Sequence, residues 1–165
     1  MILHCGLHKT ATSYIQHALT MSRRNLAEAG VTYPTMTELG HDIDAPDHNA
    51  LAERIMDRLA NGREITNLLR PVSRLKGDTI LLSAETFGTL FLTEPHLAEV
   101  LSRLSSFEAA LIYYIRRQDD LKESVFAEVV KRGHSGAIED ETHYQYDHLK
   151  RFRVVERKVP PSHLI

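Results

Sequence analysis

Short apolar runs alternate along the chain with longer stretches in which apolar residues recur every three or four positions. Apolar runs of this length, bounded by glycine, proline or polar residues, predict buried strands. They lie at residues 1–5, 31–33, 79–83 and 109–115. The recurring pattern is typical of amphipathic helices, because it gathers apolar side chains on one helical face. It is found at residues 12–29, 47–60, 93–104 and 118–132.

Two weaker helical patterns complete the series, at residues 64–75 and 144–155. Strands therefore alternate with helices along the chain. This order predicts an α/β fold in three layers, with a central parallel sheet flanked by helices on both faces. Ligands of such folds bind at the carboxyl ends of the strands. The residues that follow each strand are therefore the first place to look for chemistry.

The composition is that of an ordinary globular protein and excludes several classes. The 165 residues suit a single domain, and 42% hydrophobic with 25% charged residues argues against disorder. No run approaches the roughly 20 apolar residues of a membrane span, and no signal peptide opens the sequence. Cys5 is the single cysteine, which excludes an intramolecular disulfide, and the net charge of −2 excludes a strongly basic nucleic-acid binder. We therefore expect a cytoplasmic protein with neither a membrane nor a nucleic acid as partner.

The segment after the first strand carries the groups of an anion site. Gly6 ends the strand, and Lys9, Thr10, Thr12 and Ser13 follow around the start of the predicted helix. Free backbone N–H groups and the helix dipole favour an anion there, and a lysine with three hydroxyls adds to this. The spacing is not that of a Walker A loop, which has a second glycine directly before its lysine. The alternative interpretation is a plain strand-to-helix turn with a Thr or Ser N-cap and a solvated lysine.

A second group of polar residues follows the last predicted strand. Arg116 comes directly after the strand, and Ser124 lies eight residues later on the predicted helix. The planar fork of an arginine can bind a phosphate, and a serine two helical turns on can add a hydroxyl. The alternative is that Arg116 and Arg117 form ion pairs with Asp119 and Asp120.

The first of these segments reads His4-x-Gly6-x-His8-Lys9-Thr10-Ala11-Thr12-Ser13-x-Ile15-Gln16. It resembles the phosphosulfate-binding loop of the PAPS-dependent sulfotransferase superfamily, usually Pro-Lys-Thr-Gly-Thr-Thr/Ser (PAPS is 3′-phosphoadenosine-5′-phosphosulfate). His8 stands in place of that proline and Ala11 in place of that glycine, where a left-handed backbone would make alanine costly. Arg116 followed by Ser124 resembles the 3′-phosphate-binding element of the same superfamily.

The resemblance implies a P-loop-like fold, PAPS as the cosubstrate and no metal. It assigns nucleotide binding to His8, Lys9, Thr10, Ala11, Thr12, Ser13, Arg116 and Ser124. The reaction would move a sulfuryl group from PAPS to a hydroxyl or amine of a small-molecule or glycan acceptor. Positioning and charge stabilisation would supply most of the catalysis, as in phosphoryl transfer, with Lys9 neutralising charge on the leaving phosphate.

An acceptor hydroxyl also needs a general base. Glu85 follows the strand at residues 79–83 in a Ser-Ala-Glu run that resembles a segment of bacterial sulfotransferases, and a carboxylate there opens into the ligand crevice. The alternative is a helix-start carboxylate that satisfies backbone amides. His48 is the second candidate base and His41 the third, whereas His4 is interpreted as a core histidine with satisfied hydrogen bonds.

Two other functions stay open. Only 41 residues follow Ser124 (165 − 124), and they lack a clear counterpart of the basic, glycine-containing loop that closes over the nucleotide in sulfotransferases. A C-terminal lid is therefore expected to be short or missing, and the chain could bind PAPS or its product without turnover. A P-loop kinase of a small metabolite is favoured by Lys9 and Thr10 but opposed by the glycine spacing.

Overall fold

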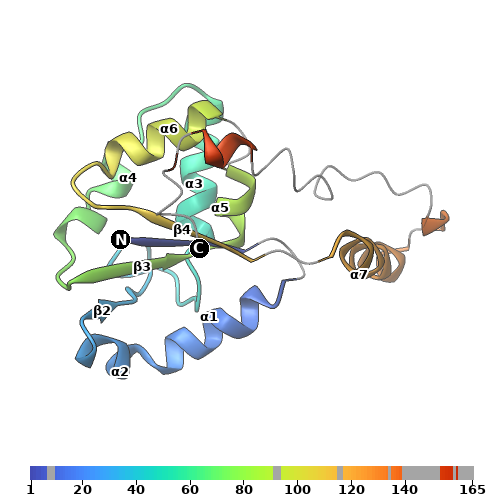
Figure 1. Cartoon of the computed structure of the whole chain (residues 1–165), viewed down its shortest axis with the longest axis horizontal. Coiled ribbons are helices and arrows are strands. Elements are labelled where there is room, and N and C mark those ends of the chain that lie inside the picture. Colours follow the sequence, from blue (N-terminus) through green and yellow to red (C-terminus); the bar gives the residue numbers. More distant parts are fainter. Residues whose placement is uncertain are drawn as a thin grey trace.

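The computed structural model describes residues 1–6, 10–90, 94–114, 117–133, 135–138, 153–157 and 159. At its centre is a sheet whose strands follow the predicted apolar runs. They are β1 (Ile2–Gly6), β2 (Val31–Thr32), β3 (Thr79–Ser83) and β4 (Ala110–Tyr114), in the spatial order β2-β3-β1-β4. Every pairing is parallel, which confirms the predicted α/β fold with a central parallel sheet (Figure 1).

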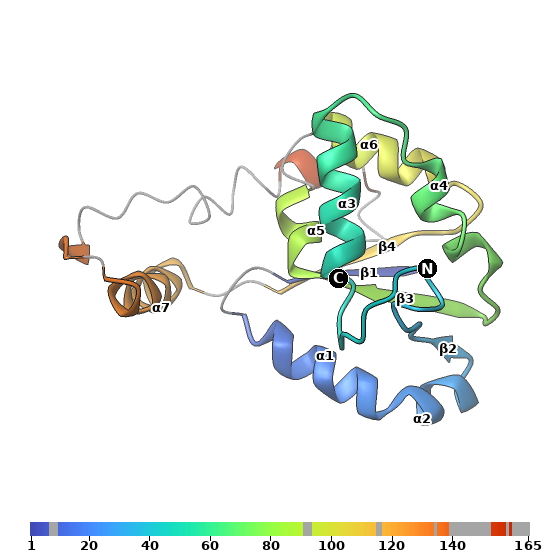
Figure 2. The same cartoon turned by 180° about the vertical axis from the view of Figure 1, so that it is seen from behind.

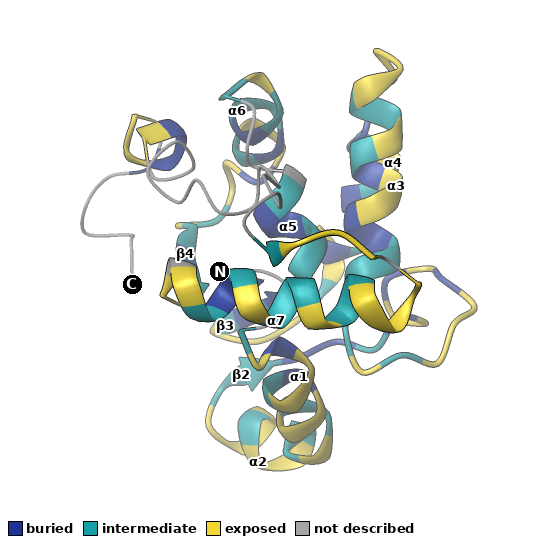
Figure 3. Ribbon diagram, turned by 90° about the vertical axis from the view of Figure 1, so that its right-hand side faces the viewer, coloured by how far each residue is buried: buried dark blue, intermediate teal, exposed yellow. Residues whose placement is uncertain are grey.

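Helices cover both faces of the sheet. They are α1 (Thr12–Met21), α2 (Arg23–Glu28), α3 (Asn49–Ala60), α4 (Thr66–Leu69), the 3-10 turn η1 (Val72–Arg74), α5 (Glu85–Leu90), α6 (Glu94–Arg103) and α7 (Gln118–Lys131). In Figures 1 and 2, α3 to α6 lie on one face and α1 with α2 on the other. Helix α7 extends beyond the carboxyl ends of the strands, and apart from Leu121 its described side chains are half-buried or exposed (Figure 3). Within the described ranges, no helix combines the length and apolar character needed to cross a membrane.

Several helical predictions differ from the structure in their extent. The predicted helix 12–29 is divided at Ser22, whose backbone (φ −97°, ψ 6°) departs from helical values. The stretch at residues 64–75 forms only α4 and η1, with Pro71 between them, because proline lacks the N–H that a continuous helix requires. The predicted helix 144–155 lies mostly outside the described residues.

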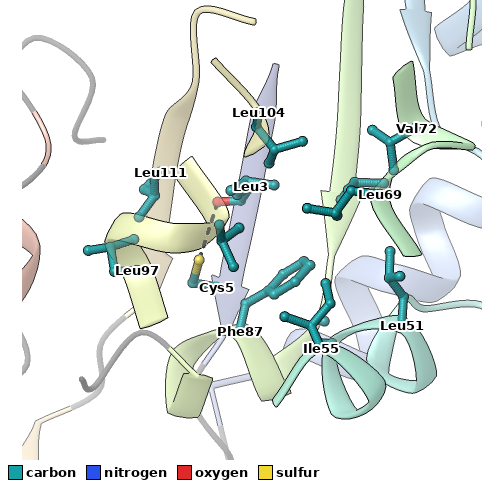
Figure 4. Packing of buried hydrophobic residues seen from close by; sticks show 14 of the residues in the cluster. Leu3, Cys5, Leu51, Ile55, Leu69, Val72, Phe87, Leu97, Leu104 and Leu111 are labelled. Carbon is teal, nitrogen blue, oxygen red and sulfur yellow. Dashed lines mark hydrogen bonds between the residues drawn. The ribbon is translucent and has the colours of Figure 1, made fainter. Parts of the chain in front are cut away.

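One face of the sheet packs an apolar core against α3, α5 and α6. Leu3 and Cys5 of β1 point to this side, and Phe87 of α5 lies between β1 and Ile55 of α3 (Figure 4). Each such buried side chain stabilises the fold by about 1.5–3 kcal/mol. Helix α5 was not predicted, since six residues are too few to show a helical period. Burial raises the pKa of the Cys5 thiol, so this cysteine is a core residue rather than a nucleophile.

The opposite face of β1 is polar at its carboxyl end. Side chains alternate between the two faces of a strand, so His4 faces α1 where Leu3 and Cys5 face the core. His4 lies in register with Ser83 of β3 and Ile112 of β4. The polar residues of the sheet therefore gather at the edge where the strands end, on the side covered by α1.

Candidate functional site

A crevice is expected between the carboxyl ends of β1 and β3. These strands are neighbours in the sheet, and the helices that follow them, α1 and α5, lie on opposite faces (Figures 1 and 2). Such a divergence marks the ligand site of open α/β sheets. His8, Lys9 and Arg116 lie outside the described residues, so their assignments stay predictions.

The chain turns into α1 through a left-handed residue. Ala11 is the N-cap, with φ 60° and ψ 19°, and it is the only non-glycine residue with positive φ among those described. This conformation costs an L-residue about 1–2 kcal/mol. Beside it, the hydroxyl oxygens of Thr10 and Thr12 lie 3.1 Å apart. Glycine, which the sulfotransferase loop usually has at the corresponding position, adopts this left-handed conformation without strain.

The N-cap residue of α1 is Ala11, which has no polar side chain to cap the helix. It makes no side-chain cap hydrogen bond, and no acidic residue lies in the first turn. The alternative of a Thr or Ser N-cap is therefore wrong, because Ala11 occupies that position. The first backbone N–H groups of this ten-residue helix and the positive end of its dipole lie at the carboxyl ends of the strands (Figure 1). This end of α1 is electrostatically suited to an anion.

The close approach of α1 to the strand end depends on Gly6. A Cβ atom at Gly6 would lie 2.1 Å from Oγ1 of Thr12, far inside van der Waals contact. Thr12 itself is 1% exposed, whereas Thr10 is half-buried and Ser13 is exposed. Of the predicted loop hydroxyls, Ser13 is thus open to solvent, whereas Thr12 is buried against Gly6 at the end of β1.

Glu85 is the first residue of α5 and is half-buried. Only Ala84 separates it from Ser83 at the end of β3, and the Ala84 N–H donates to the carbonyl oxygen of His4 at 3.1 Å. Burial lowers the pKa of His4, and the nearby charge of Glu85 acts in the opposite direction. The structure therefore brings Glu85 to the same end of the sheet as Gly6 and the start of α1.

His48 is held by backbone groups at both ring nitrogens. Its Nδ1 accepts the Ser83 N–H at 2.9 Å, and its Nε2 lies 3.0 Å from the Pro34 carbonyl oxygen, to which it donates. The His48 N–H also donates to the Ser83 carbonyl oxygen at 2.8 Å. Nδ1 accepts an N–H and so carries no proton in this arrangement, and burial lowers the pKa of His48 in the same sense. This arrangement suits a structural link beyond the end of β3 better than a base.

His4 and His41 are buried but incompletely hydrogen-bonded. Nδ1 of His4 lies 2.7 Å from Oγ of Ser83, and its ring meets the edge of Tyr114 with centroids 5.1 Å apart. Nε2 of His4 and Nδ1 of His41 have no partner among the described residues. Burial lowers the pKa of His41, and Arg54 lowers it further. His4 is buried as predicted, and its Nδ1 has a hydrogen-bond partner. The prediction that all its hydrogen bonds are satisfied is wrong for Nε2.

The second predicted element is less complete. Ser124 is half-buried on α7, which lies beyond the carboxyl ends of the strands in Figure 1. Arg117 forms a bidentate ion pair with the exposed Asp119, as the alternative interpretation predicted for this arginine. This pairing lowers the pKa of Asp119. No cluster of three metal-binding side chains occurs in the part of the chain that the structure describes.

Comparison with known proteins found no matching family model, curated protein or solved structure.

Proposed function

We propose that this chain is a PAPS-dependent sulfotransferase-like protein. The observation that supports this best is the N-terminus of α1, whose N-cap is a left-handed Ala11 without a capping side chain and whose first residue, Thr12, packs directly on Gly6. Such an end binds the anionic groups of a nucleotide with backbone N–H donors. The resemblance of the loop sequence to the phosphosulfate-binding loop narrows the anion to the 5′-phosphosulfate.

The predicted roles follow from this anion site. Lys9 neutralises the charge that develops on the 5′-phosphate, while Thr10 and Ser13 add hydroxyl donors. PAPS supplies the sulfuryl group, whose bond to the 5′-phosphate breaks as the acceptor oxygen or nitrogen bonds to sulfur. Glu85 takes the proton of the acceptor, and adenosine 3′,5′-bisphosphate is the second product. We prefer Glu85 to His48 as the base because both ring nitrogens of His48 are bonded to backbone groups.

Thermal unfolding with added nucleotide tests the binding step. Adenosine 3′,5′-bisphosphate at 100 times its Kd should stabilise the protein by about 2.7 kcal/mol, or about 5–10 °C in Tm, without Mg²⁺. Lys9→Ala should remove most of this shift. Lys76→Ala is the matched control, since Lys76 is exposed and precedes β3 at the opposite end of the sheet. Stabilisation by ATP with Mg²⁺ alone would contradict the proposal and favour a kinase.

Transfer from labelled PAPS to a panel of hydroxyl and amine acceptors tests the chemical step. Glu85→Gln should keep the Kd for the bisphosphate within about twofold and lose most of the transfer, because the amide cannot take the proton. Binding without transfer to any acceptor would favour the nucleotide-binding module instead. Full transfer by Glu85→Gln would exclude Glu85 as the base.

A further inference from the structure

The interface between α1 and the sheet is polar, in contrast to the apolar core on the other face. Thr12, Gln16 and Thr20 are spaced four residues apart and so lie along one side of α1. Thr12 lies against Gly6, and Oγ1 of Thr20 donates to the Pro46 carbonyl oxygen at 3.2 Å. Gln16, one turn from each, therefore lies between these two contacts and faces the sheet.

Two sets of hydrogen bonds involve polar groups of the sheet and of the segment before α3. Nδ1 of His4 meets Oγ of Ser83 at 2.7 Å. The hydroxyl of Tyr33 donates to the Pro46 carbonyl oxygen at 2.6 Å, which is the oxygen that Thr20 also contacts. His4 is on the face of β1 that α1 covers (Figure 1), and Pro46 joins the segment before α3 to Thr20 of α1.

Two nitrogen atoms in this interface have no partner. Nε2 of Gln16 and Nε2 of His4 are both buried without a hydrogen bond among the described residues, in side chains that are 2% and 3% exposed. An orphaned buried polar group is costly, so its retention calls for an explanation. The two atoms are complementary, since a glutamine amide nitrogen only donates and a histidine nitrogen can accept.

We propose that Gln16 and His4 are a positioning pair, in which the Gln16 amide donates to Nε2 of His4, directly or through one water, when an anion binds at the N-terminus of α1. In this state the Nδ1–H of His4 donates to Ser83, which leaves Nε2 as the acceptor. The pair joins α1, which carries the anion site, to His4 of β1. Through the bond of His4 to Ser83, it also reaches the end of β3, two residues before Glu85. This inference rests on the proposed function and adds the means by which nucleotide binding aligns the base.

The proposal predicts opposite effects on the free and the bound protein. Leucine is close to glutamine in size and has no polar group to leave orphaned, so Gln16→Leu should not lower, and should slightly raise, the urea midpoint of the free protein. The same change removes a hydrogen bond of the bound state. It should therefore weaken the binding of adenosine 3′,5′-bisphosphate by about fivefold to tenfold. A residue with only a packing role would move stability and affinity in the same direction.

Calorimetric titration with adenosine 3′,5′-bisphosphate and urea unfolding should be measured on the wild type, Gln16→Leu, His4→Phe and the double variant. His17→Leu is the control, because His17 is exposed on the outer side of α1. The double variant should bind no more weakly than the weaker single variant. Should His4→Phe fail to fold, the ¹⁵N resonances of the His4 ring in the wild type and Gln16→Leu replace it. Nε2 should be unprotonated and should shift on nucleotide binding in the wild type only.

The outcomes separate the two proposals. If the wild type binds no bisphosphate, the proposed function is rejected, and the positioning pair falls with it. If the wild type binds and Gln16→Leu binds equally well, or Nε2 of His4 is protonated, the pair alone is rejected. Equal losses in Gln16→Leu and His17→Leu would also overturn the pair.

Discussion

Replacing Ala11 by glycine tests the geometry on which the candidate site depends. Ala11 holds φ 60°, a conformation in which its Cβ crowds the following carbonyl oxygen. Glycine lacks that Cβ and adopts the same conformation without strain. Ala11→Gly should therefore stabilise the folded chain, although most alanine-to-glycine changes destabilise proteins.

Two opposing effects set the size of this gain. The left-handed conformation costs an L-residue about 1–2 kcal/mol, which the substitution recovers. Glycine makes the unfolded chain more flexible, which costs about 0.5–1 kcal/mol. The two ranges leave a net gain of about 0–1.5 kcal/mol with its centre at about 0.75 kcal/mol, and for a chain of this size the central value corresponds to a rise in Tm of about 1.5–3 °C.

Thermal and urea unfolding of three proteins tests whether Ala11→Gly stabilises the fold. Alongside the wild type and Ala11→Gly, Ala18→Gly is the matched control, since Ala18 is exposed in the interior of the same helix. The control should lose about 1 kcal/mol, because glycine is the poorer helix former. Opposite signs for the two changes are expected. A loss of stability in Ala11→Gly equal to that in Ala18→Gly would show that residue 11 is not left-handed.

Three further predictions concern the same end of the sheet. Gly6→Ala should destabilise the fold by roughly 1–3 kcal/mol in urea unfolding, because the new methyl group displaces Thr12; an unchanged midpoint would contradict this close approach. His48→Ala should cost about 2–4 kcal/mol, since the buried Ser83 N–H loses its acceptor, and a cost below 1 kcal/mol would argue against that bond. Burial holds the folded pKa values of His4 and His48 below the ordinary 6.5. As the pH falls, the two rings therefore bind protons in the unfolded state before they do so in the folded state. The free energy of unfolding should be constant above about pH 6.5 and decrease below it, by up to about 1.4 kcal/mol per pH unit for each ring. Urea midpoints that stay constant from pH 7 to 5 would exclude this linkage.

The strands were predicted closely because each is a short apolar run with clear boundaries. The run at residues 79–83 coincides with β3, and the runs at 1–5 and 109–115 match β1 and β4 within one residue at each end. Helix ends were less predictable. The helix predicted over residues 47–60, with Asp47 as its cap, begins at Asn49; its N-cap is His48, and the Asp47 carboxylate accepts the Asn49 N–H.

The candidate site was predictable only in part. The anion-binding segment could be found from Gly6 and the hydroxyl residues that follow it, because these are neighbours in the chain. Gln16 and the open nitrogen of His4 were missed as functional groups, although both belong to the loop motif. In the sequence they appear only as a histidine on a strand and a glutamine one turn into the next helix. This pattern does not distinguish them from other polar residues that face the core.

The sequence by itself determined the order of strands and helices, the parallel sheet and the segment that joins β1 to α1, because periodicity and turn residues act over a few neighbouring positions. The tertiary structure alone decided what the polar residues do. His4 and Ser83 are 79 residues apart, and Ser83 and His48 are 35 apart. The approach of the segment before α3 to β3 bonded both ring nitrogens of His48 to backbone groups. The pairing of β1 with β3 brought Glu85 to the same end of the sheet as the start of α1, and no local pattern in the chain records such long-range contacts.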